Sequence, residues 1–545
     1  MRLIVNGYNG KRYMEIHRVS SKRKLLGLLI VFVILFVAIF FIESARNSNF
    51  YGNMQFCTDY EEIMRQEEVE LADLSYDMTD ALMFNGQQVP YTIQNRTFYI
   101  SQDIDSLYWE GELNAAEGYK IYILEDSMWD LKMDAIAQGH LFSILIIKGN
   151  QCQPANIVAS GLPILSLTET YGYENPQAIA LLDEKQEMSY EGYCSFEIRG
   201  HTSAALPKLG YKIELCDEQW NKEEASLLGL RMDDDWIINA LYTDNHKVRE
   251  KMAYQIWDEI QEYRQTENRA SNVSYVELIL NNQYWGIYGL QEPVDAEQLS
   301  LTDSDVMYRK TDLLVPEQAD FDVEDGTKTI AGFEIREPNE TEIEGEDWMP
   351  MQRHVEYIYN QSDELDKENV RSMLDINNAV DFELYIQILA APDNITKNIN
   401  YVARYENGNY KMYQMPWDVD YTFGHDYGGT PTFSEYKEMY EESIMHSREY
   451  SALLLVDREA VNEQLEETWK IYRQDILSEE HLKSMAQSFM DELTRSGALA
   501  RDSARWPESG DTADLSEIYH FIERRLEFLD EYYEDIDRWE VEHGI

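Results

Sequence analysis

Apolar and polar residues alternate along several short stretches between residues 83 and 160. These stretches (VPYTIQ, RTFYISQ, YKIYILED and HLFSILIIKG) lie between Gly, Asn and Asp turns, which is typical of short strands. We therefore predict a small β-rich module. The Gly-Leu-Pro sequence at residues 161–163 favours a boundary, after which LPILSLTET and AIALLDE predict the first strands of a larger α+β domain.

Two further patterns predict β-hairpins in the larger domain. The first pairs FEIRG at residues 196–200 with YKIEL at residues 211–215. The second lies in YVELILNNQYWGIYGLQEPVD, where Asn281 and Asn282 join two strands.

Between these hairpins, DDDWIINALYTDNHKVREKMAYQIWDEI predicts a helix. Its apolar positions recur at helical spacing at Val248, Met252, Ile256 and Ile260. Because acidic residues open the segment, we expect Asp235 and Trp236 to cap or staple the helix.

Residues 381–424 contain a helix-like stretch, a polar loop, a strand pair and an acidic turn, and we expect the domain to be organised around them. Residues 310–365 are acidic and rich in turn residues, which indicates an insertion packed on the core. Residues 450–545 carry several amphipathic patterns, which predict a helical C-terminal part.

The N-terminus contains an apolar run at residues 25–42, LLGLLIVFVILFVAIFFI. A run of this length, apolar on every face, can cross a bilayer as a helix. The basic residues before it are Arg12, Arg18, Lys22, Arg23 and Lys24. Because positive charge stays on the cytoplasmic side, we predict a single-pass signal anchor in the cell membrane, with the rest of the chain outside the cytoplasm. A cleaved signal peptide is the alternative.

The 545-residue chain has 46 Lys and Arg against 102 Asp and Glu, a formal net charge of −56. Nucleic-acid binding depends on clustered basic residues, so this charge argues against nucleic acid as a partner. Any site for an anionic ligand must be a local basic exception.

Four cysteines do not make a disulfide scaffold in a chain of this length. If the first hairpin pairs symmetrically, Cys194 faces Cys216 closely enough for a disulfide in an oxidising compartment. Two free buried thiols are the alternative.

Candidate chemistry is concentrated in residues 381–424. Asp393 and Asn398 fall in Asp-Asn-Ile-Thr-Lys-Asn, and Asp418 and Asp420 follow in Pro-Trp-Asp-Val-Asp after about the length of one hairpin. In protein kinases, an Asp in the catalytic loop orients the acceptor. An Asn further along the same loop and an Asp later in the chain hold magnesium. The spacing resembles such a metal site, and oxygen ligands suit magnesium.

A second candidate site is the cationic stretch FEIRGHTSAALPKLGYKIEL. Arg199, Lys208 and Lys212 lie within fourteen residues of an otherwise acidic chain, around a Gly-His-Thr-Ser turn. Backbone amides, hydroxyl groups and positive charge in one loop suit a phosphate. A hairpin with ordinary surface cations is the alternative.

The order of these motifs resembles the CotH family of spore-coat-type atypical protein kinases over roughly residues 160–440. The motifs are RGHTS…PKLGYKIEL, DW…LYTDNHKVREKMAYQIW, VELILNNQYWGIYGLQEPVD, DNITKN and MPWDVDYTFG. The ordinary kinase signatures G-x-G-x-x-G, V-A-I-K and D-F-G are missing from the sequence. Glu250 stands where the family usually has Asn, so no helix ion pair is assigned there.

The resemblance implies a divergent two-lobed kinase-like fold with ATP and Mg²⁺ or Mn²⁺ as cofactors. It implies that Asp393 is the catalytic Asp and that Asn398 and Asp418 bind the metal, with Asp420 as a possible helper. The residues implied to contact phosphates are Arg199, Ser203, Lys208 and Lys212. Glu292 is implied to lie in the hinge near adenine.

The expected function is transfer of the ATP γ-phosphate to Ser or Thr of a surface or coat protein. A catalytically inactive surface structural or adhesion protein on the same fold is one alternative, and a nucleotidyl (AMP) transferase is another. The expected organisation has five parts. They are a cytoplasmic segment (1–24), a transmembrane anchor (25–42), a stalk and β-rich module (43–160), the kinase-like core (161–440) and a helical C-terminal part (441–545).

Overall fold

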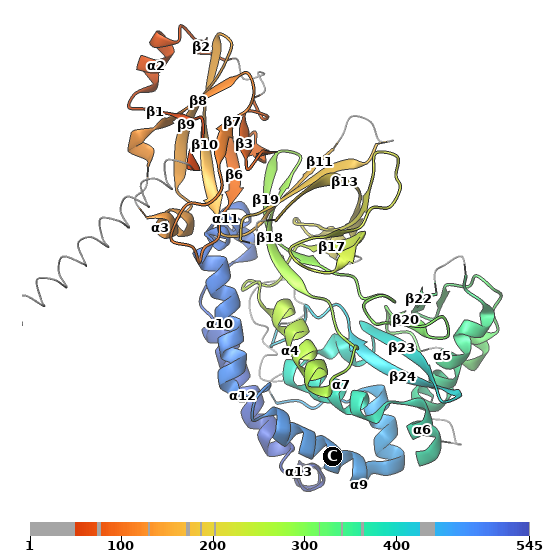
Figure 1. The fold of residues 1–545 in the computed structure, drawn as a ribbon. Coiled ribbons are helices and arrows are strands. Elements are labelled where there is room, and N and C mark those ends of the chain that lie inside the picture. The colour runs from red at the N-terminus through yellow and green to blue at the C-terminus, as the bar shows by residue number, and fades with distance from the viewer. Residues whose placement is uncertain are drawn as a thin grey trace, which may run out of the picture.

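The protein has a mixed α+β architecture, as predicted, in the computed structural model shown in Figure 1. The structure describes residues 50–72, 78–128, 131–169, 175–185, 188–200, 203–315, 317–338, 342–360, 365–425 and 442–543. The predicted anchor at residues 25–42 lies outside these residues. Within the described part, no helix is both long and apolar enough to span a membrane.

The N-terminal module is built on a sheet whose strands follow the order β1-β8-β9-β10-β6-β5, with β2 also paired to β10. A small sheet of order β4-β3-β7 and the helices α2 (Tyr60–Gln66) and α3 (Lys132–Ala137) accompany it. The strands of the large sheet are β1 (Gln55–Cys57), β2 (Glu70–Leu71), β5 (Tyr91–Thr92), β6 (Thr97–Ser101), β8 (Tyr119–Leu124), β9 (Leu141–Lys148) and β10 (Gln151–Ser160). Those of the small sheet are β3 (Leu82–Phe84), β4 (Gln87–Gln88) and β7 (Leu113–Ala115). The strands predicted from alternation are therefore confirmed.

A closed barrel follows, with strand order β11-β12-β13-β14-β17-β19-β18. Its strands are β11 (Ile164–Thr168), β12 (Gln177–Asp183), β13 (Met188–Arg199), β14 (Gly210–Cys216), β17 (Asp235–Asn239), β18 (Val273–Leu280) and β19 (Gln283–Gln291). Apolar side chains such as Ile213, Trp236 and Tyr288 form its core. The predicted turn at Asn281 and Asn282 is confirmed: both have positive φ (51° and 57°), as a two-residue hairpin turn requires.

The structure corrects the expected start of the helix after the barrel strand. Asp235 and Trp236 belong to β17, and α4 begins only at Arg249 and ends at Arg264. Trp236 is fully buried in the barrel core, so the acidic residues before it precede a strand rather than a helix.

The first predicted hairpin exists as β13 and β14, but its register is shifted by one residue. Cys194 lies opposite Leu215, and Cys216 lies opposite Tyr193. A shift of one residue reverses which face each side chain takes. Of the two alternatives, the structure therefore shows free, buried thiols at Cys194 and Cys216 rather than a disulfide.

A five-stranded sheet of order β21-β22-β20-β23-β24 forms the next part of the chain. The strands are β20 (Val306–Lys310), β21 (Thr329–Ile330), β22 (Phe333–Glu337), β23 (Ile399–Glu406) and β24 (Asn409–Pro416). Residues 310–365, predicted as an insertion, contribute β21 and β22 to this sheet, and Phe333 and Trp348 are fully buried. The segment therefore belongs to the core.

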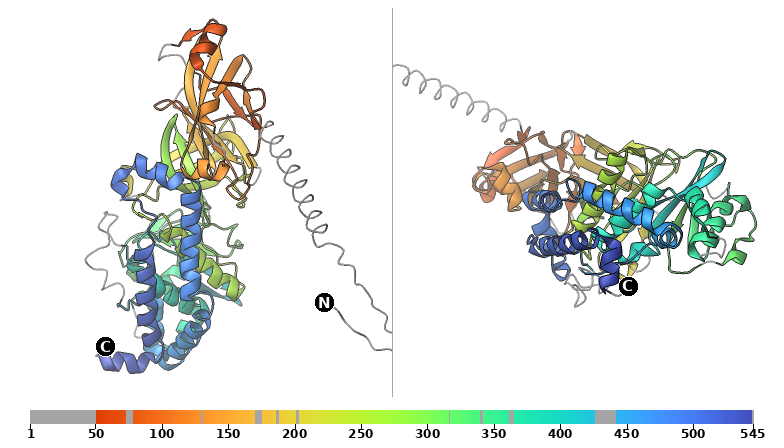
Figure 2. Two further views of the ribbon diagram at one scale, coloured as in Figure 1. Left: turned by 90° about the vertical axis from the view of Figure 1, so that its left-hand side faces the viewer. Right: turned by 90° about the horizontal axis from the view of Figure 1, so that it is seen from below.

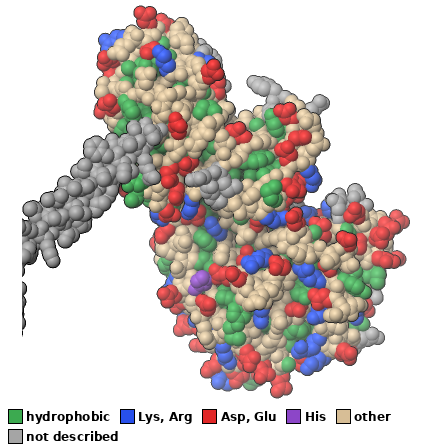
Figure 3. Space-filling view, in the orientation of Figure 1, with side chains coloured by type: hydrophobic (Ala, Val, Ile, Leu, Met, Phe, Trp, Pro, Cys, Tyr) green, Lys and Arg blue, Asp and Glu red, His purple; other side chains and the backbone are tan. Residues whose placement is uncertain are grey.

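Helices pack around this sheet and complete the C-terminal part, as predicted. They are α5 (Met349–His354), α6 (Lys367–Met373), α7 (Ile376–Leu389), α9 (Arg448–Tyr472), α10 (Glu479–Arg495), α11 (Ala498–Arg505), α12 (Ser516–Tyr532) and α13 (Ile536–His543). Figures 1 and 2 show α10 running from the C-terminal helices toward the N-terminal module, where α11 lies. Arg495, the last residue of α10, bonds Asp105 of the module at 2.9 Å. Acidic side chains are spread over the face in Figure 3.

Trp257→Ala is expected to lower the free energy of unfolding by about 3–5 kcal/mol, because it empties a packed core position. Trp257 on α4 is fully buried, packs edge-on against Phe382 and Tyr385 of α7, and donates its indole N–H to the Asn268 carbonyl at 2.8 Å. Denaturant unfolding measures the loss. Tyr263→Ala, at a 52% exposed position of the same helix, should cost about 1 kcal/mol or less; equal losses would contradict this packing.

Candidate active site

Two loops emerge side by side at one end of the five-stranded sheet. Ile399, the first residue of β23, lies between Lys310 at the end of β20 and Pro416 at the end of β24. The loop before β23 carries Asp393 and Asn398, and the turn after β24 carries Asp418 and Asp420. The sheet register therefore brings the two halves of the predicted motif together.

Backbone carbonyls of the two loops are joined by one amide side chain. Asn394 donates from Nδ2 to the carbonyl oxygens of Asn398 (2.8 Å) and Trp417 (2.9 Å). The Trp417 backbone N–H also donates to the Asn398 carbonyl at 3.0 Å. Asn394 is 1% exposed, so these bonds lie out of competition with solvent.

Asn398 and Asp418 both have left-handed backbone conformations, with φ of 55° and 54°. This conformation is costly for a residue other than glycine and often marks functional sites. Asn398 donates from Nδ2 to the Asp418 carbonyl at 3.2 Å. The Asp418 backbone N–H donates to the hydroxyl oxygen of Tyr254 on α4 at 3.2 Å. Each strained residue is thus held by neighbouring groups.

Asp393 lies in the one-turn 3₁₀ helix Pro392–Ile395, directly after α7. It is 7% exposed, and Lys397 pairs with its carboxylate at 2.7 Å. An Asp in this loop can accept a hydrogen bond from an incoming hydroxyl while Lys397 holds one of its oxygens.

Carboxylates gather at this end of the sheet. Burial, and then the charges of Asp418, Glu250 and Asp393, raise the pKa of Asp420 well above its usual range. Burial and the charge of Asp418 also raise the pKa of Glu250, to about 7. The Glu250 carboxylate accepts hydrogen bonds from Asn239 (2.6 Å) and Gln291 (3.0 Å) of the barrel. Like charges this close favour a proton or a cation between them.

The oxygen donors at this site suit a divalent cation whose coordination shell is completed by a second molecule. Asn398 and Asp418 supply hard oxygen donors, and no described residue donates to the Asn398 side-chain oxygen. Among the residues that the structure describes, however, no three His, Cys, Asp or Glu side chains form a metal site by themselves. This composition fits Mg²⁺ bound partly by phosphate oxygens, as kinases bind it.

Two arginines stack on Trp417 beside the carboxylates. The guanidinium carbon of Arg309 lies 3.7 Å from the ring centroid and that of Arg199 lies 4.9 Å from it. Arg309 donates from Nε to Asn400 at 2.9 Å, and no carboxylate ion pair of either arginine occurs in the described part of the chain. Burial, with repulsion from Arg336 and Arg199, lowers the pKa of Arg309 to about 9. An anion would relieve this repulsion.

Arg199 thus lies next to the turn that carries Asp418, and Ser203 follows it in the connection between β13 and β14; the phosphate contact of Arg199 stays a prediction. The Ser203 hydroxyl occupies the space beside Gly200, which has φ of 98°, so a side chain at residue 200 would meet that oxygen. Lys212 pairs with Glu214 and with Asp235 (3.4 Å) on the outer side of the barrel. The phosphate contacts of Ser203 and Lys212 stay predictions.

Lys208 does not take the place expected for it. Its ammonium is completely buried and pairs with Asp502 of α11 at 2.9 Å, so the structure corrects its assignment as a phosphate contact.

Glu292 follows β19, at the connection predicted as a hinge. Its carboxylate accepts hydrogen bonds from the Arg231 backbone and from Asn272, both at 2.8 Å, and so is already engaged within the protein.

Sequence reasoning did not identify Arg309, Tyr254 and Trp417 as site residues, and it left the role of Glu250 open. Arg309 and Trp417 lie 108 positions apart on β20 and after β24, and only the sheet register brings them together. An Arg at the end of a strand in a strongly acidic chain was the available signal.

Comparison with known families bears directly on this geometry. A sequence model of the CotH kinase protein family matches residues 196–529, which is more than half of the chain. The chain belongs to the CotH kinase family. The match covers the barrel from the end of β13 onward, both loops of the site and most of the C-terminal helices. No curated protein matches the chain. CotH membership agrees with the resemblance found in the motifs, but the match begins at residue 196 rather than about 160 and ends at residue 529 rather than about 440.

Glu250→Gln is expected to stabilise the protein at pH 8 by on the order of 1–3 kcal/mol and to have little effect near pH 4.5. The pKa of Glu250 is raised from 4.5 to about 7, so the folded state binds this proton more tightly than the unfolded chain does. Its ionisation then removes stability as the pH rises from about 4.5 past 7. Glutamine cannot ionise, so the variant escapes this loss.

Denaturant unfolding between pH 4.5 and pH 8, without divalent cations, measures the difference. Glu262→Gln, at an exposed position of α4, is the matched control and should follow the parent protein at every pH. A constant difference between Glu250→Gln and the parent would contradict the raised pKa.

Proposed function

We propose that this protein is a membrane-anchored, extracytoplasmic CotH-like kinase that transfers the γ-phosphate of ATP to Ser or Thr of a surface or coat protein. The observation that carries the proposal is the meeting of Asn398 and Asp418, both held in left-handed backbone conformations, at one end of a sheet beside Asp393. Family membership supports kinase chemistry. The apolar run at residues 25–42 supports the anchor.

In this proposal the barrel and the sheet with its helices are the two lobes of a divergent kinase-like fold. ATP lies between them, with Glu292 in the connection near adenine. Arg199 and Arg309 would approach the phosphates from the barrel and from the sheet, and both guanidinium groups lie over the Trp417 ring. Ser203 and Lys212 are further candidates for phosphate contacts.

Asn398 and Asp418 would hold Mg²⁺ or Mn²⁺, with Asp420 as a helper. The bound metal would neutralise negative charge on the phosphates. Asp393 would orient the acceptor hydroxyl toward the γ-phosphorus and accept its proton as the new O–P bond forms, while the bond from the γ-phosphorus to the β-phosphate oxygen breaks and ADP leaves. Lys397, paired with Asp393 at 2.7 Å, restricts the carboxylate to one orientation. Tyr254 fixes the turn that carries Asp418. Positioning and charge neutralisation supply most of the catalysis in phosphoryl transfer.

Two other functions remain distinct outcomes of the same assay. A surface structural or adhesion protein on this fold would bind no ATP. A nucleotidyl transferase would bind ATP with its α-phosphorus next to the acceptor and transfer AMP. The meeting of the oxygen donors Asn398 and Asp418 beside Asp393 favours an active enzyme, because these are the residue types that kinase chemistry requires.

Asp418→Asn is expected to lower γ-phosphate transfer at least about a hundredfold, because it removes an ionised metal ligand. Purified residues 43–545 would be given Mg²⁺ or Mn²⁺ and ATP labelled separately at the γ- and α-phosphates, and label would be counted on the protein and on added acceptors. Asp303→Asn, at an exposed turn, is the control and should keep full activity.

Label from the α-phosphate would replace the kinase proposal with nucleotidyl transfer. If no label is transferred and calorimetry detects no ATP binding, the alternative of a surface structural or adhesion protein would replace the kinase proposal.

Arg309→Met is expected to raise the KM for ATP at least about tenfold and to change the KM for the acceptor little, because one charge-assisted contact to phosphate is lost. Arg353→Met is the control, since the exposed Arg353 lies on α5 and its described hydrogen bond is to the half-buried Asn409 side chain at 3.0 Å. Steady-state kinetics with varied ATP measures both variants. An unchanged KM for ATP in Arg309→Met would contradict a phosphate site formed by the arginines that lie over the Trp417 ring.

A further inference from the structure

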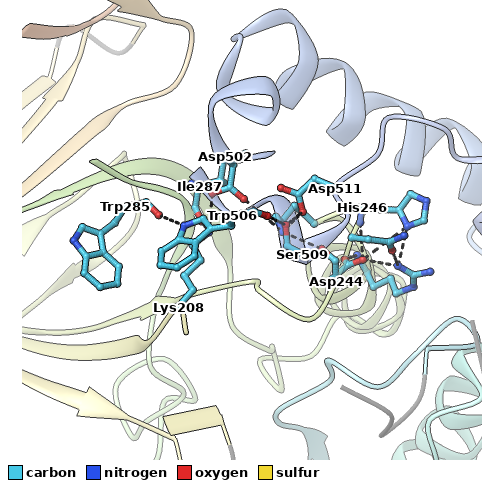
Figure 4. Close-up of polar contacts among 12 residues, drawn as sticks. Lys208, Asp244, His246, Trp285, Ile287, Asp502, Trp506, Ser509 and Asp511 are labelled. Atoms are coloured by element: carbon cyan, nitrogen blue, oxygen red, sulfur yellow. Dashed lines mark hydrogen bonds and ion pairs between the residues drawn. The ribbon is translucent and has the colours of Figure 1, made fainter. Parts of the chain in front are cut away.

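The C-terminal segment 498–515 lies between the barrel and the start of α4, where it forms a buried network of charges. Figure 4 shows Asp502, Ser509 and Asp511 of this segment facing Lys208 of the barrel and the loop that contains Asp244 and His246. The side chains of Lys208, Lys247, Asp502 and Asp511 are all 0% exposed. The segment thus joins parts of the protein that are far apart in sequence.

Asp502 connects the barrel to this network. One of its carboxylate oxygens accepts hydrogen bonds from Lys208 (2.9 Å) and from the Ile287 backbone N–H of β19 (2.8 Å). Its second oxygen lies 3.5 Å from the Lys247 ammonium. The indole N–H of Trp506 donates to the Trp285 carbonyl at 2.8 Å, so α11 is fixed to β19 at two levels.

Asp511 and its neighbours hold the loop before α4. Lys247 donates to Asp511 at 2.6 Å, and Ser509 donates to the same carboxylate oxygen at 2.7 Å. The Thr512 backbone N–H donates to the Asn245 carbonyl at 3.0 Å. Lys247 has a left-handed backbone with φ of 63°, a strained conformation that these contacts maintain.

The loop itself is organised so that its position sets the start of α4. Asp244 accepts hydrogen bonds from the backbone N–H groups of His246 (3.0 Å) and Arg249 (2.8 Å), and it also pairs with the Arg249 guanidinium. His246 bonds the Asp514 carbonyl at 3.0 Å through Nε2. Arg249 is the first residue of α4, and Glu250, which faces the candidate active site, is the second.

We infer that segment 498–515 is a clasp that positions α4 for the reaction, with Asp502 and Asp511 as positioning residues acting through Lys247. The inference rests on the proposed function, because α4 matters to catalysis through Tyr254 and Glu250. Tyr254 accepts a hydrogen bond from the Asp418 backbone N–H, and Glu250, one turn earlier on α4, accepts hydrogen bonds from Asn239 and Gln291 of the barrel. A shift at residues 244–249 therefore moves both groups relative to Asp418.

The chemistry of the clasp favours positioning over simple stabilisation. Two buried lysines and two buried aspartates are expensive to desolvate, and apolar residues of similar size stabilise a core at least as well. Charges in a buried site instead permit only one arrangement of their elements, because any other leaves an unpaired charge. The Lys208, Lys247, Asp502 and Asp511 network fixes one register between α11, β19 and the start of α4.

Asp511→Asn and Lys247→Met test the inference in the full chain. Both are expected to raise the Kd for Mg-ATP, measured by calorimetry, at least about tenfold. Hydrogen exchange at residues 249–256 should become at least about tenfold faster in both, because the start of α4 loses its anchor. Asp502→Asn removes a carboxylate that contacts both Lys208 and Lys247, so we expect a larger loss of stability. If this variant folds, the same two measurements apply to it.

Arg501→Gln is the matched control. Arg501 precedes Asp502 on α11 and forms a buried ion pair with Glu277 of β18 at 2.7 Å, but no described contact joins it to residues 244–249. This variant should lower the Tm comparably while Mg-ATP affinity and exchange in α4 stay within about twofold of the parent.

The inference would be overturned if Arg501→Gln changed the Kd for Mg-ATP and the α4 exchange rate as much as Asp511→Asn and Lys247→Met do. It would also be overturned if hydrogen exchange in α4 were unchanged in Asp511→Asn and Lys247→Met. Failure of the parent protein to bind Mg-ATP would instead contradict the proposed function. The exchange measurement would still decide whether the clasp holds α4.

Discussion

The hydrogen bonds from the Asn394 amide to the carbonyls of Asn398 and Trp417 are the interaction on which the site depends. They tie the loop before β23 to the turn after β24, and they hold the strained backbones of Asn398 and Asp418 next to each other. The Trp417 backbone N–H, which donates to the Asn398 carbonyl, and the Asn398 side chain, which donates to the Asp418 carbonyl, join the same two segments. The sheet supplies the approximate proximity, and this buried amide supplies the exact geometry on which phosphoryl transfer depends.

The charge distribution around the loops would allow a strongly acidic protein to hold the proposed nucleotide. Asp393, Asp418, Asp420 and Glu250 repel one another and favour a cation. Arg199 and Arg309 lie on the adjacent Trp417 ring and repel one another in turn. A metal nucleotide, with cationic and anionic parts, satisfies both groups at once.

Local patterns in the sequence predicted many elements of the fold. Alternation predicted the strands of the N-terminal module, and Asn281-Asn282 predicted the turn between β18 and β19. Long-range pairing could not be predicted in this way: closure of the barrel depends on β11 pairing with β18, more than a hundred residues later. Asp235 and Trp236 resembled the start of a helix because acidic residues open both helices and turns before strands.

The candidate site was predictable where the chemistry lies within one motif. Asp393, Asn398, Asp418 and Asp420 share 28 residues of sequence, and the hairpin between them could be read from its pattern. Lys208 was misplaced because its partner Asp502 lies 294 positions away. No local pattern distinguishes a lysine that binds phosphate from one that pairs with a distant buried carboxylate.

A crystal structure of residues 43–545 with Mg²⁺ and a non-hydrolysable ATP analogue would test the central claim most directly. The account predicts one metal ion bound by Asn398 and Asp418, phosphate oxygens within hydrogen-bonding distance of Arg199 and Arg309, and the γ-phosphate facing Asp393. A nucleotide bound elsewhere, or one whose phosphates avoid Asn398 and Asp418, would contradict it.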